Sequence, residues 1–318
     1  MVSYRTARQH AILAGGGEWP IPLNPQPSTL NSQLAMTAQS QQDVCCLMGM
    51  PVAGNPTQYM LEKAFEAGRV DWRFLTFEVS PRDFEGALRG ARIFGFRGIL
   101  LAPPHRDTVL PYLEEVSKAA RLSGQVNCIA QVGGRLHGTN TEGIALRQLI
   151  KPVMAIAGAQ VTIVGAGRLA RSIASELALA GAGELVFACR QPETLATLIP
   201  QLLEQTPLSA CRAAVLDGPY EISKDCQLLI NATPVGRHNP DEPLPVNLAS
   251  LAAEAVVADV VYNPPGTWLI REVAQRNCPT IDGLTLYIER TALAFETWTA
   301  ADADRGVMRE AVEEFLVL

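Results

Sequence analysis

A glycine-rich turn between an apolar run and a helical run gives the clearest chemical signal in the chain. The segment VTIVGAGRLARS places Gly165, Gly167 and Ala170 in a Gly-x-Gly-x-x-Ala spacing directly after a strand-like run. Gly165 permits a tight turn, Gly167 lets backbone amides approach a pyrophosphate at a helix N-terminus, and Ala170 allows close packing. The spacing therefore predicts a dinucleotide site; the alternative is a structural strand-to-helix turn without a ligand.

The residue that selects between the two nicotinamide cofactors is expected about twenty residues further on. An NAD site usually carries an acidic residue there, which binds the ribose 2′-hydroxyl. The next strand-like run instead ends in FACRQPE, so Arg190 stands where a cation can meet a 2′-phosphate. This pattern favours NADP, and NAD is possible because Glu193 is close. The alternative for Arg190 is a solvated arginine at a strand end.

Polar residues also follow other apolar runs. Arg106 follows GILLAPPH, Asn127 follows a short run, residues 140–142 (Asn-Thr-Glu) lie between glycines, and Tyr262 closes the run VVADVVY. Open α/β sheets bind ligands at the carboxyl ends of their strands. Arginine cannot give up its proton near neutral pH, so Arg106 suits an electrostatic role better than proton transfer. The alternative for each of these segments is a plain turn.

The segments that must position these residues alternate between strand-like and helical patterns. The alternation over residues 44–148 predicts an α/β unit with a largely parallel sheet, and a second series over residues 149–283 predicts a doubly wound sheet. Residues 284–318 are expected to be helical throughout. Residues 1–43 are rich in Gly, Pro, Asn and Ser without a period and are interpreted as a tail.

Two shorter helical expectations follow from local patterns. The segment SPRDFEGALRGARIFG places Ser80 and Pro81 where a helix cap and a first helical residue belong. The segment TVLPYLEEVSKAARLSG, residues 108–124, is expected to form one helix.

Composition excludes several classes of protein. The chain has 318 residues, 48% of them hydrophobic, which is enough for two domains with a sizeable core. The net charge of −6 argues against nucleic acid or an anionic membrane as a partner, and no apolar run reaches membrane-spanning length. Seven scattered cysteines without a CxxC spacing favour a reducing cytoplasm over a disulfide framework, and no metal site is expected.

Eight segments together resemble the shikimate/quinate 5-dehydrogenase family over about residues 47–300. They are GMPVAGNPTQYMLEKAF, GILLAPPHRDTVLPYLEEV, GQVNCI, GRLHGTNTEG, VGAGRLARS, LLINATPVG, DVVYNPPGT and IDGLTLYIERTALAFETWTA. The resemblance implies an α/β substrate domain at residues 44–148, on which the helices of residues 284–318 pack back. It also implies an NADP-binding Rossmann domain at residues 149–283.

The implied activity is the NADP-linked interconversion of 3-dehydroshikimate and shikimate by hydride transfer. Two alternatives stay open: a dehydrogenase for quinate or another cyclic hydroxy acid, and a catalytically inactive dinucleotide-binding protein of the same fold. The implied partner is a small cyclic hydroxy acid, and the protein is expected to be a monomer or a homodimer.

The resemblance also implies which residues form the site. The implied substrate-binding residues are Asn55, Thr57, Asn127, Asn140, Thr141, Tyr262 and Arg290. The implied cofactor-binding residues are Gly165, Ala166, Gly167, Arg168, Leu169, Ala170, Arg190, Asn231, Ala232, Thr233 and Gly283.

The chain departs from the family pattern where the chemistry is done. The family usually has a lysine where this chain has Arg106 and an aspartate where it has Glu142, and these two positions form its catalytic pair. The other departures replace two serines, a threonine and a glutamine by Asn55, Thr57, Ala102 and Arg290, respectively. We therefore expect Arg106 to orient the substrate, Glu142 to take the proton, and Arg290 to supply a cation for a substrate carboxylate. Activity with shikimate itself is expected to be low.

Overall fold

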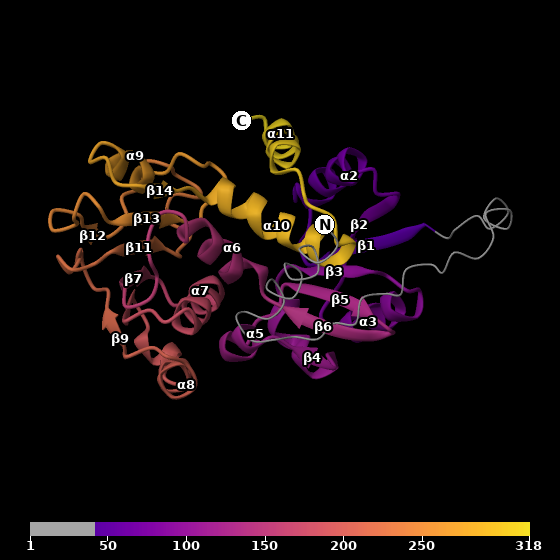
Figure 1. The fold of residues 1–318 in the computed structure, drawn as a ribbon, viewed down its shortest axis with the longest axis horizontal. Helices are drawn as coiled ribbons and strands as arrows, with labels where there is room; N and C mark the ends of the chain where they lie inside the picture. Colours follow the sequence, from indigo (N-terminus) through magenta and orange to yellow (C-terminus); the bar gives the residue numbers. More distant parts are fainter. Residues whose placement is uncertain (1–41) are drawn as a thin grey trace, which may run out of the picture. The chain divides into compact units, whose positions relative to one another are not determined.

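The computed structural model describes residues 42–318, in which the apolar runs of the sequence form two six-stranded sheets (Figure 1). The described residues divide into two units. The first unit contains the residues up to Val116, Val126–Gly138 and Ala294–Leu318, and the second unit contains Ser117–Gln125 and Thr139–Leu293. The expected tail lies outside the described residues except for its last two positions, and the first strand begins at Asp43.

The sheet of the first unit has the order β2-β1-β3-β5-β6-β4. Its strands are β1 (Asp43–Gly49), β2 (Trp72–Glu78), β3 (Gly98–Leu101), β4 (Glu115–Val116), β5 (Cys128–Val132) and β6 (Arg135–Thr139). Strand β1 pairs in parallel with β2 and β3, whereas β5 runs antiparallel to β3. The sheet is therefore mixed. Strands β5 and β6 are neighbours joined by the Gly133–Gly134 turn, and both glycines have positive φ.

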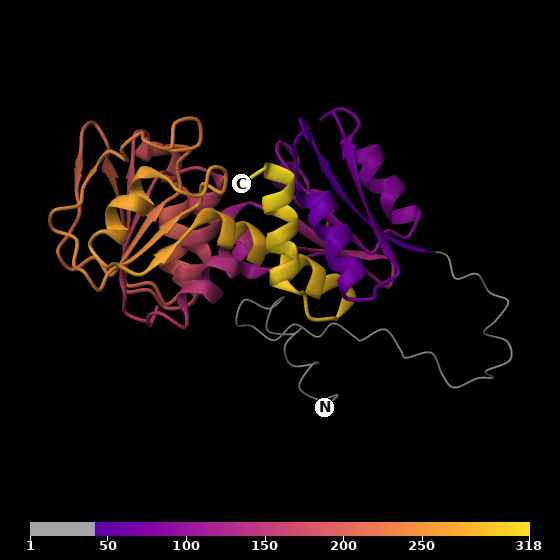
Figure 2. The same ribbon diagram turned by 90° about the horizontal axis from the view of Figure 1, so that it is seen from above.

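The first unit also contains several helices. They are α2 (Thr57–Ala67), α3 (Phe84–Ile93), the short α4 (His105–Thr108) and α11 (Arg305–Leu316). Helix α11 packs beside α2 (Figure 2), where the Tyr59 hydroxyl donates to Glu314 at 2.6 Å. Near the end of α10 (Gly283–Thr299), the Trp298 indole lies so close to β3 that a Cβ at Gly98 would overlap it.

Two local predictions for residues 80–124 are wrong. Residues 108–124 do not form one helix: Pro111 lies in a 3₁₀ turn (Leu110–Tyr112), β4 follows and pairs with β6, and α5 (Lys118–Ser123) begins only after Ser117. Helix α3 starts at Phe84 rather than at Pro81, because the Ser80 hydroxyl donates to the Asp83 carboxylate at 2.6 Å in a preceding turn instead of capping the helix. In both segments, local contacts and sheet pairing override helical periodicity.

The sheet of the second unit has the order β14-β13-β11-β7-β8-β9, and its neighbouring strands pair in parallel. Its strands are β7 (Gln160–Val164), β8 (Glu184–Cys189), β9 (Ala210–Val215), β11 (Leu228–Asn231), β13 (Val256–Asp259) and β14 (Thr280–Ile281). In chain order this is the doubly wound arrangement 3-2-1-4-5-6, whose direction reverses between β7 and β11. The predicted α/β class with a Rossmann sheet is confirmed.

The second unit also contains several helices and a two-stranded pair. They are α5, α6 (Thr141–Ile150), α7 (Arg168–Leu179), α8 (Leu198–Gln205), α9 (Trp268–Ala274), the first part of α10, and the two-stranded pair β10 (Tyr220–Glu221) and β12 (Val246–Asn247). Helix α6 packs on α7. Within residues 42–318, no helix is both long enough and apolar enough to cross a membrane. The last segment is not one helix, since a break with Ala300 at positive φ separates α10 from α11.

Candidate active site

The predicted glycine turn lies at the carboxyl end of β7, where the strand order reverses. Gly165 has φ +111°, and its amide donates to the Ala188 carbonyl at 2.8 Å. Gly167 is the N-cap residue of α7, and as a glycine it places no side chain over the first turn of the helix. A Cβ built at Gly167 would meet no heavy atom within 4 Å. Glycine at this position leaves open space beside the N-terminus of α7, where helix amides and the helix dipole favour an anion, so the turn fits a pyrophosphate.

The neighbouring strand end is shaped by a network that begins at Asn231. Its side-chain oxygen accepts from the Thr233 amide at 3.0 Å and from the Thr233 hydroxyl at 2.6 Å, and its amide group donates to Asp259 at 3.0 Å. Asp259 in turn accepts from the Thr267 hydroxyl at 2.7 Å. A Cβ at Gly165 would come within 3.0 Å of the Ala232 carbonyl oxygen, so residues 231–233 form a wall of the turn.

Sequence reasoning missed Asp259. Burial raises the pKa of its carboxyl, although hydrogen bonds from Val261, Thr267 and Asn231 oppose that rise. The available signal was an acidic residue at the end of the apolar run EAVVAD. A buried acid there needs several donors, and the structure supplies them from the next strand end and the next loop.

Arg190 and Arg168 are exposed cations at this end of the sheet. Arg190 directly follows β8, whose Ala188 carbonyl binds the glycine turn, and Arg168 is the first residue of α7. Gly283, the other glycine expected at the cofactor, begins α10, and a Cβ there would overlap the Val261 carbonyl. Close packing against the Val261 carbonyl thus explains why residue 283 is a glycine. Contact between Gly283 and the cofactor stays a prediction.

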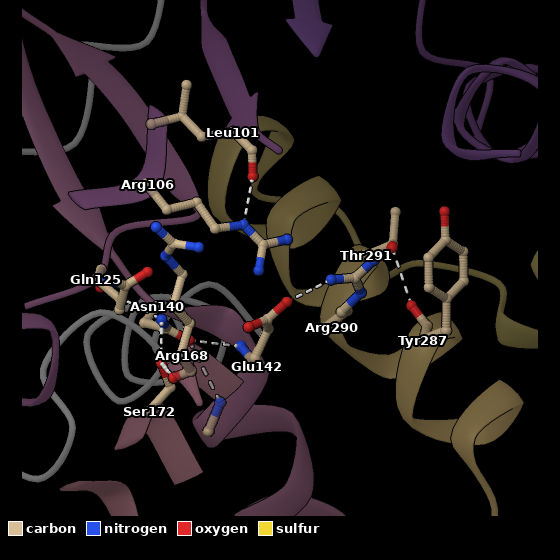
Figure 3. A network of polar contacts seen from close by, with 11 residues as sticks. Leu101, Arg106, Gln125, Asn140, Glu142, Arg168, Ser172, Tyr287, Arg290 and Thr291 are labelled. Atoms are coloured by element: carbon tan, nitrogen blue, oxygen red, sulfur yellow. Dashed lines mark hydrogen bonds and ion pairs between the residues drawn. The ribbon is translucent and has the colours of Figure 1, made fainter. Parts of the chain in front are cut away.

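The second unit also brings together Glu142, Arg290 and Tyr262. Glu142 lies in the first turn of α6 and is 3% exposed. The Arg290 guanidinium of α10 points at its carboxylate and donates from Nη1 to Oε1 at 2.5 Å (Figure 3). These two residues are 148 positions apart in the sequence, so no local pattern predicted their pairing.

Aromatic rings support the Arg290 side of this pair. The guanidinium carbon lies 4.4 Å from the centre of the Tyr287 ring, and Tyr287 stacks on Tyr262 with ring centres 4.4 Å apart. Burial works against the charge of Arg290, but the Glu142 carboxylate and the two tyrosines outweigh it, so the pKa of Arg290 is raised above its ordinary value. Arg290 is therefore a fixed cation.

Asn140 fixes the start of α6. Its side-chain oxygen accepts from the Glu142 amide at 3.0 Å, which makes it the N-cap. Its amide group donates to the Ser172 hydroxyl at 2.8 Å and to the Gln125 carbonyl at 3.2 Å, and Ser172 donates to the Arg168 carbonyl at 3.1 Å (Figure 3). The first turns of α6 and α7 are thus joined by buried hydrogen bonds, and sequence reasoning missed Ser172.

Replacing Ser172 by alanine is expected to lower the free energy of unfolding by about 1–3 kcal/mol, because it leaves the buried Asn140 amide group short of an acceptor. Ser175 is the matched control: it is equally buried on α7, but its hydroxyl only donates to the Arg171 carbonyl one turn back. Urea unfolding of both variants measures the difference. Equal losses for S172A and S175A would show that the link to Asn140 has no energetic weight.

The first unit holds Arg106, Asn127, Asn55 and Thr57. The Arg106 Nε donates to the Leu101 carbonyl at 2.8 Å (Figure 3), and the Leu101 amide donates to the Asn127 carbonyl at 2.8 Å. The Asn55 side chain accepts from the Thr57 amide at 2.9 Å at the start of α2. Asn55, Thr57 and Arg106 follow β1 and β3, two adjacent parallel strands, so they share the carboxyl edge of one sheet. Asn127 does not follow a strand as expected: it precedes β5, which runs antiparallel to β3 and therefore begins at the same edge.

His105 has a structural role in this unit. Its ring is 1% exposed, stacks on Phe84 with ring centres 4.2 Å apart, and hydrogen-bonds the Val79 carbonyl through Nε2 at 2.8 Å. The role of its neighbour Arg106 in the chemistry stays a prediction.

Comparison with known proteins adds to this geometry. A family model described as the shikimate dehydrogenase substrate binding domain matches residues 47–129. Together with the doubly wound sheet and its glycine turn, the match defines an α/β dehydrogenase of the NAD(P)-dependent class. The chain is 35% identical over 289 residues to the shikimate dehydrogenase (NADP(+)) of Methanopyrus kandleri, a match that covers 89% of this chain and 99% of that protein. The chain belongs to the shikimate dehydrogenase family.

Two solved structures show the same fold. The ligand-free 5-ketofructose reductase of Gluconobacter sp. strain CHM43 has a TM-score of 0.83 and 33% identity, covering 86% of this chain and 99% of that chain. The shikimate 5-dehydrogenase of Thermus thermophilus, in complex with NADP(H) and shikimate, has a TM-score of 0.73 and 29% identity, covering 86% of this chain and all of that chain.

Proposed function

We propose that this protein is an NADP-dependent oxidoreductase that interconverts 3-dehydroshikimate and shikimate. The observation that carries the proposal is the match to the M. kandleri shikimate dehydrogenase (NADP(+)) over 99% of its length. The glycine turn that precedes α7 and the buried Glu142 carboxylate support it, because the reaction needs a dinucleotide site and a group that can exchange a proton.

The proposed domains follow the sequence boundaries, with residues 44–148 and the helices of 284–318 in the substrate domain and residues 149–283 in the cofactor domain. A small cyclic hydroxy acid is the proposed substrate, and the protein is a monomer or a homodimer. The proposed compartment is the cytoplasm, which the seven free cysteines support because six of them are buried and none is paired in a disulfide.

The cofactor end of the proposed site uses backbone and cationic groups. The amides at the start of α7 would hold the pyrophosphate and Arg190 the 2′-phosphate of NADP. When it is bound, the nicotinamide supplies the hydride or accepts it. Residues 231–233 and Gly283 would line the same end of the sheet, a role that their positions after β11 and at the start of α10 support.

The substrate end divides proton transfer and orientation between two residues. Glu142 takes the hydroxyl proton when shikimate is oxidised and returns it when the ketone is reduced. Arg106 stays protonated, so it orients the substrate and stabilises the developing alkoxide without carrying a proton. Asn55, Thr57, Asn127, Asn140, Thr141 and Tyr262 are the proposed hydrogen-bonding partners of the substrate.

A second candidate is an NADPH-dependent reductase of a neutral keto sugar. The TM-score of 0.83 to 5-ketofructose reductase exceeds the 0.73 to the Thermus shikimate dehydrogenase. The Asn55 oxygen already accepts from the Thr57 amide, and Arg290 is already paired with Glu142. Both interactions leave these side chains less able to bind a substrate carboxylate, and so they favour an uncharged polyol as the substrate.

Steady-state kinetics with a panel of substrates tests the two candidates. NADP reduction is measured with shikimate and with quinate, and NADPH oxidation with 3-dehydroshikimate and with 5-ketofructose. The main proposal expects the highest kcat/KM in the shikimate pair, even if kcat falls below the usual ~10 per second. A kcat/KM for 5-ketofructose about tenfold above that for 3-dehydroshikimate, a difference of about 1.4 kcal/mol in transition-state stabilisation, would replace it by the second candidate.

Replacing Arg190 by alanine is expected to raise the Kd of NADP about tenfold or more and to leave that of NAD unchanged, because only NADP carries the 2′-phosphate. Fluorescence titration of the two reduced cofactors measures this. Arg82→Ala, an exposed arginine of the first unit, serves as the charge-matched control. Equal losses for both cofactors in R190A would contradict the assignment.

A further inference from the structure

Helix α6 carries two ion pairs that differ in their surroundings. At its start, Glu142 is paired with Arg290 at 2.5 Å, and near its end Arg147 is paired with Glu176 of α7 at 3.1 Å. Each pair joins a buried carboxylate to a partly buried arginine. Only the first stands at the N-terminus of α6, beside the proposed substrate residues Asn140 and Thr141.

The Arg290 side chain is held on several sides. The Tyr287 ring lies against its guanidinium, Tyr262 stacks on Tyr287, and the Glu142 carboxylate accepts from its Nη1. Glu142 is in turn held at its backbone by Asn140. These contacts hold the guanidinium in one position, from which it donates to one oxygen of the Glu142 carboxylate. The negative charge of that carboxylate compensates the positive charge of the guanidinium.

We infer that Arg290 is a positioning residue, which acts through Glu142 by fixing the place of its carboxylate and does not itself bind a substrate carboxylate. This inference rests on the proposed function, in which Glu142 exchanges the proton. Because Glu142 and Arg290 compensate each other's charge, this end of the site favours a substrate hydroxyl over a substrate carboxylate. The anionic group of a hydroxy acid must then be held by residues other than Arg290.

The two roles give different kinetics. A residue that positions the proton-exchanging carboxylate mainly affects kcat, because a misplaced group costs up to about 10²-fold in rate. A residue that binds the substrate equally in the ground and transition states mainly affects KM. We therefore expect Arg290→Gln to lower kcat about 10–100-fold with KM within about threefold of the wild type, and Arg290→Lys to recover part of the loss.

A double-mutant cycle separates action through Glu142 from independent action. Glu142→Gln, Arg290→Gln and the double variant are assayed with the panel substrate that the wild type uses best. If Arg290 acts through Glu142, the double variant has the kcat of E142Q alone, within about threefold. The control is Arg147→Gln, which breaks the second ion pair of α6 and is expected to lower thermal stability while kcat stays within about threefold of the wild type.

Each other outcome overturns the inference. A rise in KM with unchanged kcat in R290Q would make Arg290 a substrate ligand, and additive losses in the cycle would show that it acts independently of Glu142. A loss of kcat in R147Q as large as that in R290Q would reduce both pairs to structural roles. If the wild type turns over a panel substrate but the losses in the double-mutant cycle are additive, only this inference is refuted. If the wild type turns over none of the panel substrates, the proposed function is refuted as well.

Discussion

Replacing Glu142 by glutamine is expected to lower kcat for the proposed reaction by a factor of about 10²–10⁴, the usual contribution of a positioned general acid–base. Glutamine keeps the size of the side chain and an oxygen that can accept from Arg290, so the fold is retained. It cannot exchange the proton, and Arg106 cannot replace it. Stopped-flow or steady-state measurement of NADPH absorbance gives kcat directly.

Glu296→Gln is the matched control for this variant. Glu296 is also a buried glutamate paired with an arginine, since its Oε1 accepts from Arg305 Nη1 at 2.7 Å, but both residues lie in the first unit at the α10–α11 break. We expect E296Q to lose some stability and no more than about half of its kcat. If E142Q kept more than a third of the wild-type kcat, the proton would have to pass through another group.

Replacing Gly167 by valine is expected to weaken the binding of both NADP and NAD about 10²-fold. The backbone there is extended, with φ −71° and ψ −177°, and a Cβ meets no heavy atom within 4 Å, so valine fits the apo fold. Its methyl groups would occupy the open space beside the N-terminus of α7, where the pyrophosphate is proposed to lie. Losing about 3 kcal/mol of anion contacts corresponds to two factors of ten in Kd.

Isothermal titration with both cofactors, together with thermal unfolding, measures this effect. Gly218→Val, at another open glycine, is the control and should change neither Kd. Unchanged NADP affinity in G167V would mean that the pyrophosphate lies elsewhere. A fall in stability equal to the loss of affinity would point to distortion of the fold instead.

The second sheet could be predicted almost strand by strand, because in a parallel sheet covered on both faces each strand is a continuous apolar run. Such runs end at turn residues, and the Gly165 turn marks the first strand of the series. The mixed first sheet was harder to predict. Strand β4 (Glu115–Val116) exists only through its pairing with β6, a tertiary contact that the helical pattern around it conceals.

The candidate site shows the same division between local and distant information. Arg106, Glu142 and the glycine turn could be found because each follows a recognisable strand end. The Glu142–Arg290 pair, the Ser172–Asn140 hydrogen bond and the Asp259–Asn231 hydrogen bond join residues 28 to 148 positions apart. Which polar groups satisfy one another across such distances depends on the packing of helices and strand ends, and a single sequence does not carry that pairing.

Transfer of deuterium from NADPH to the substrate is the most direct test of the central claim. The wild-type protein is incubated with 3-dehydroshikimate and NADPH deuterated at either C4 position, and the product is analysed by mass spectrometry. The proposed function predicts shikimate that carries one deuterium from one of the two labelled cofactors and none from the other. The proposed function would be contradicted if no shikimate formed, or if the shikimate carried no deuterium with either of the two labelled cofactors.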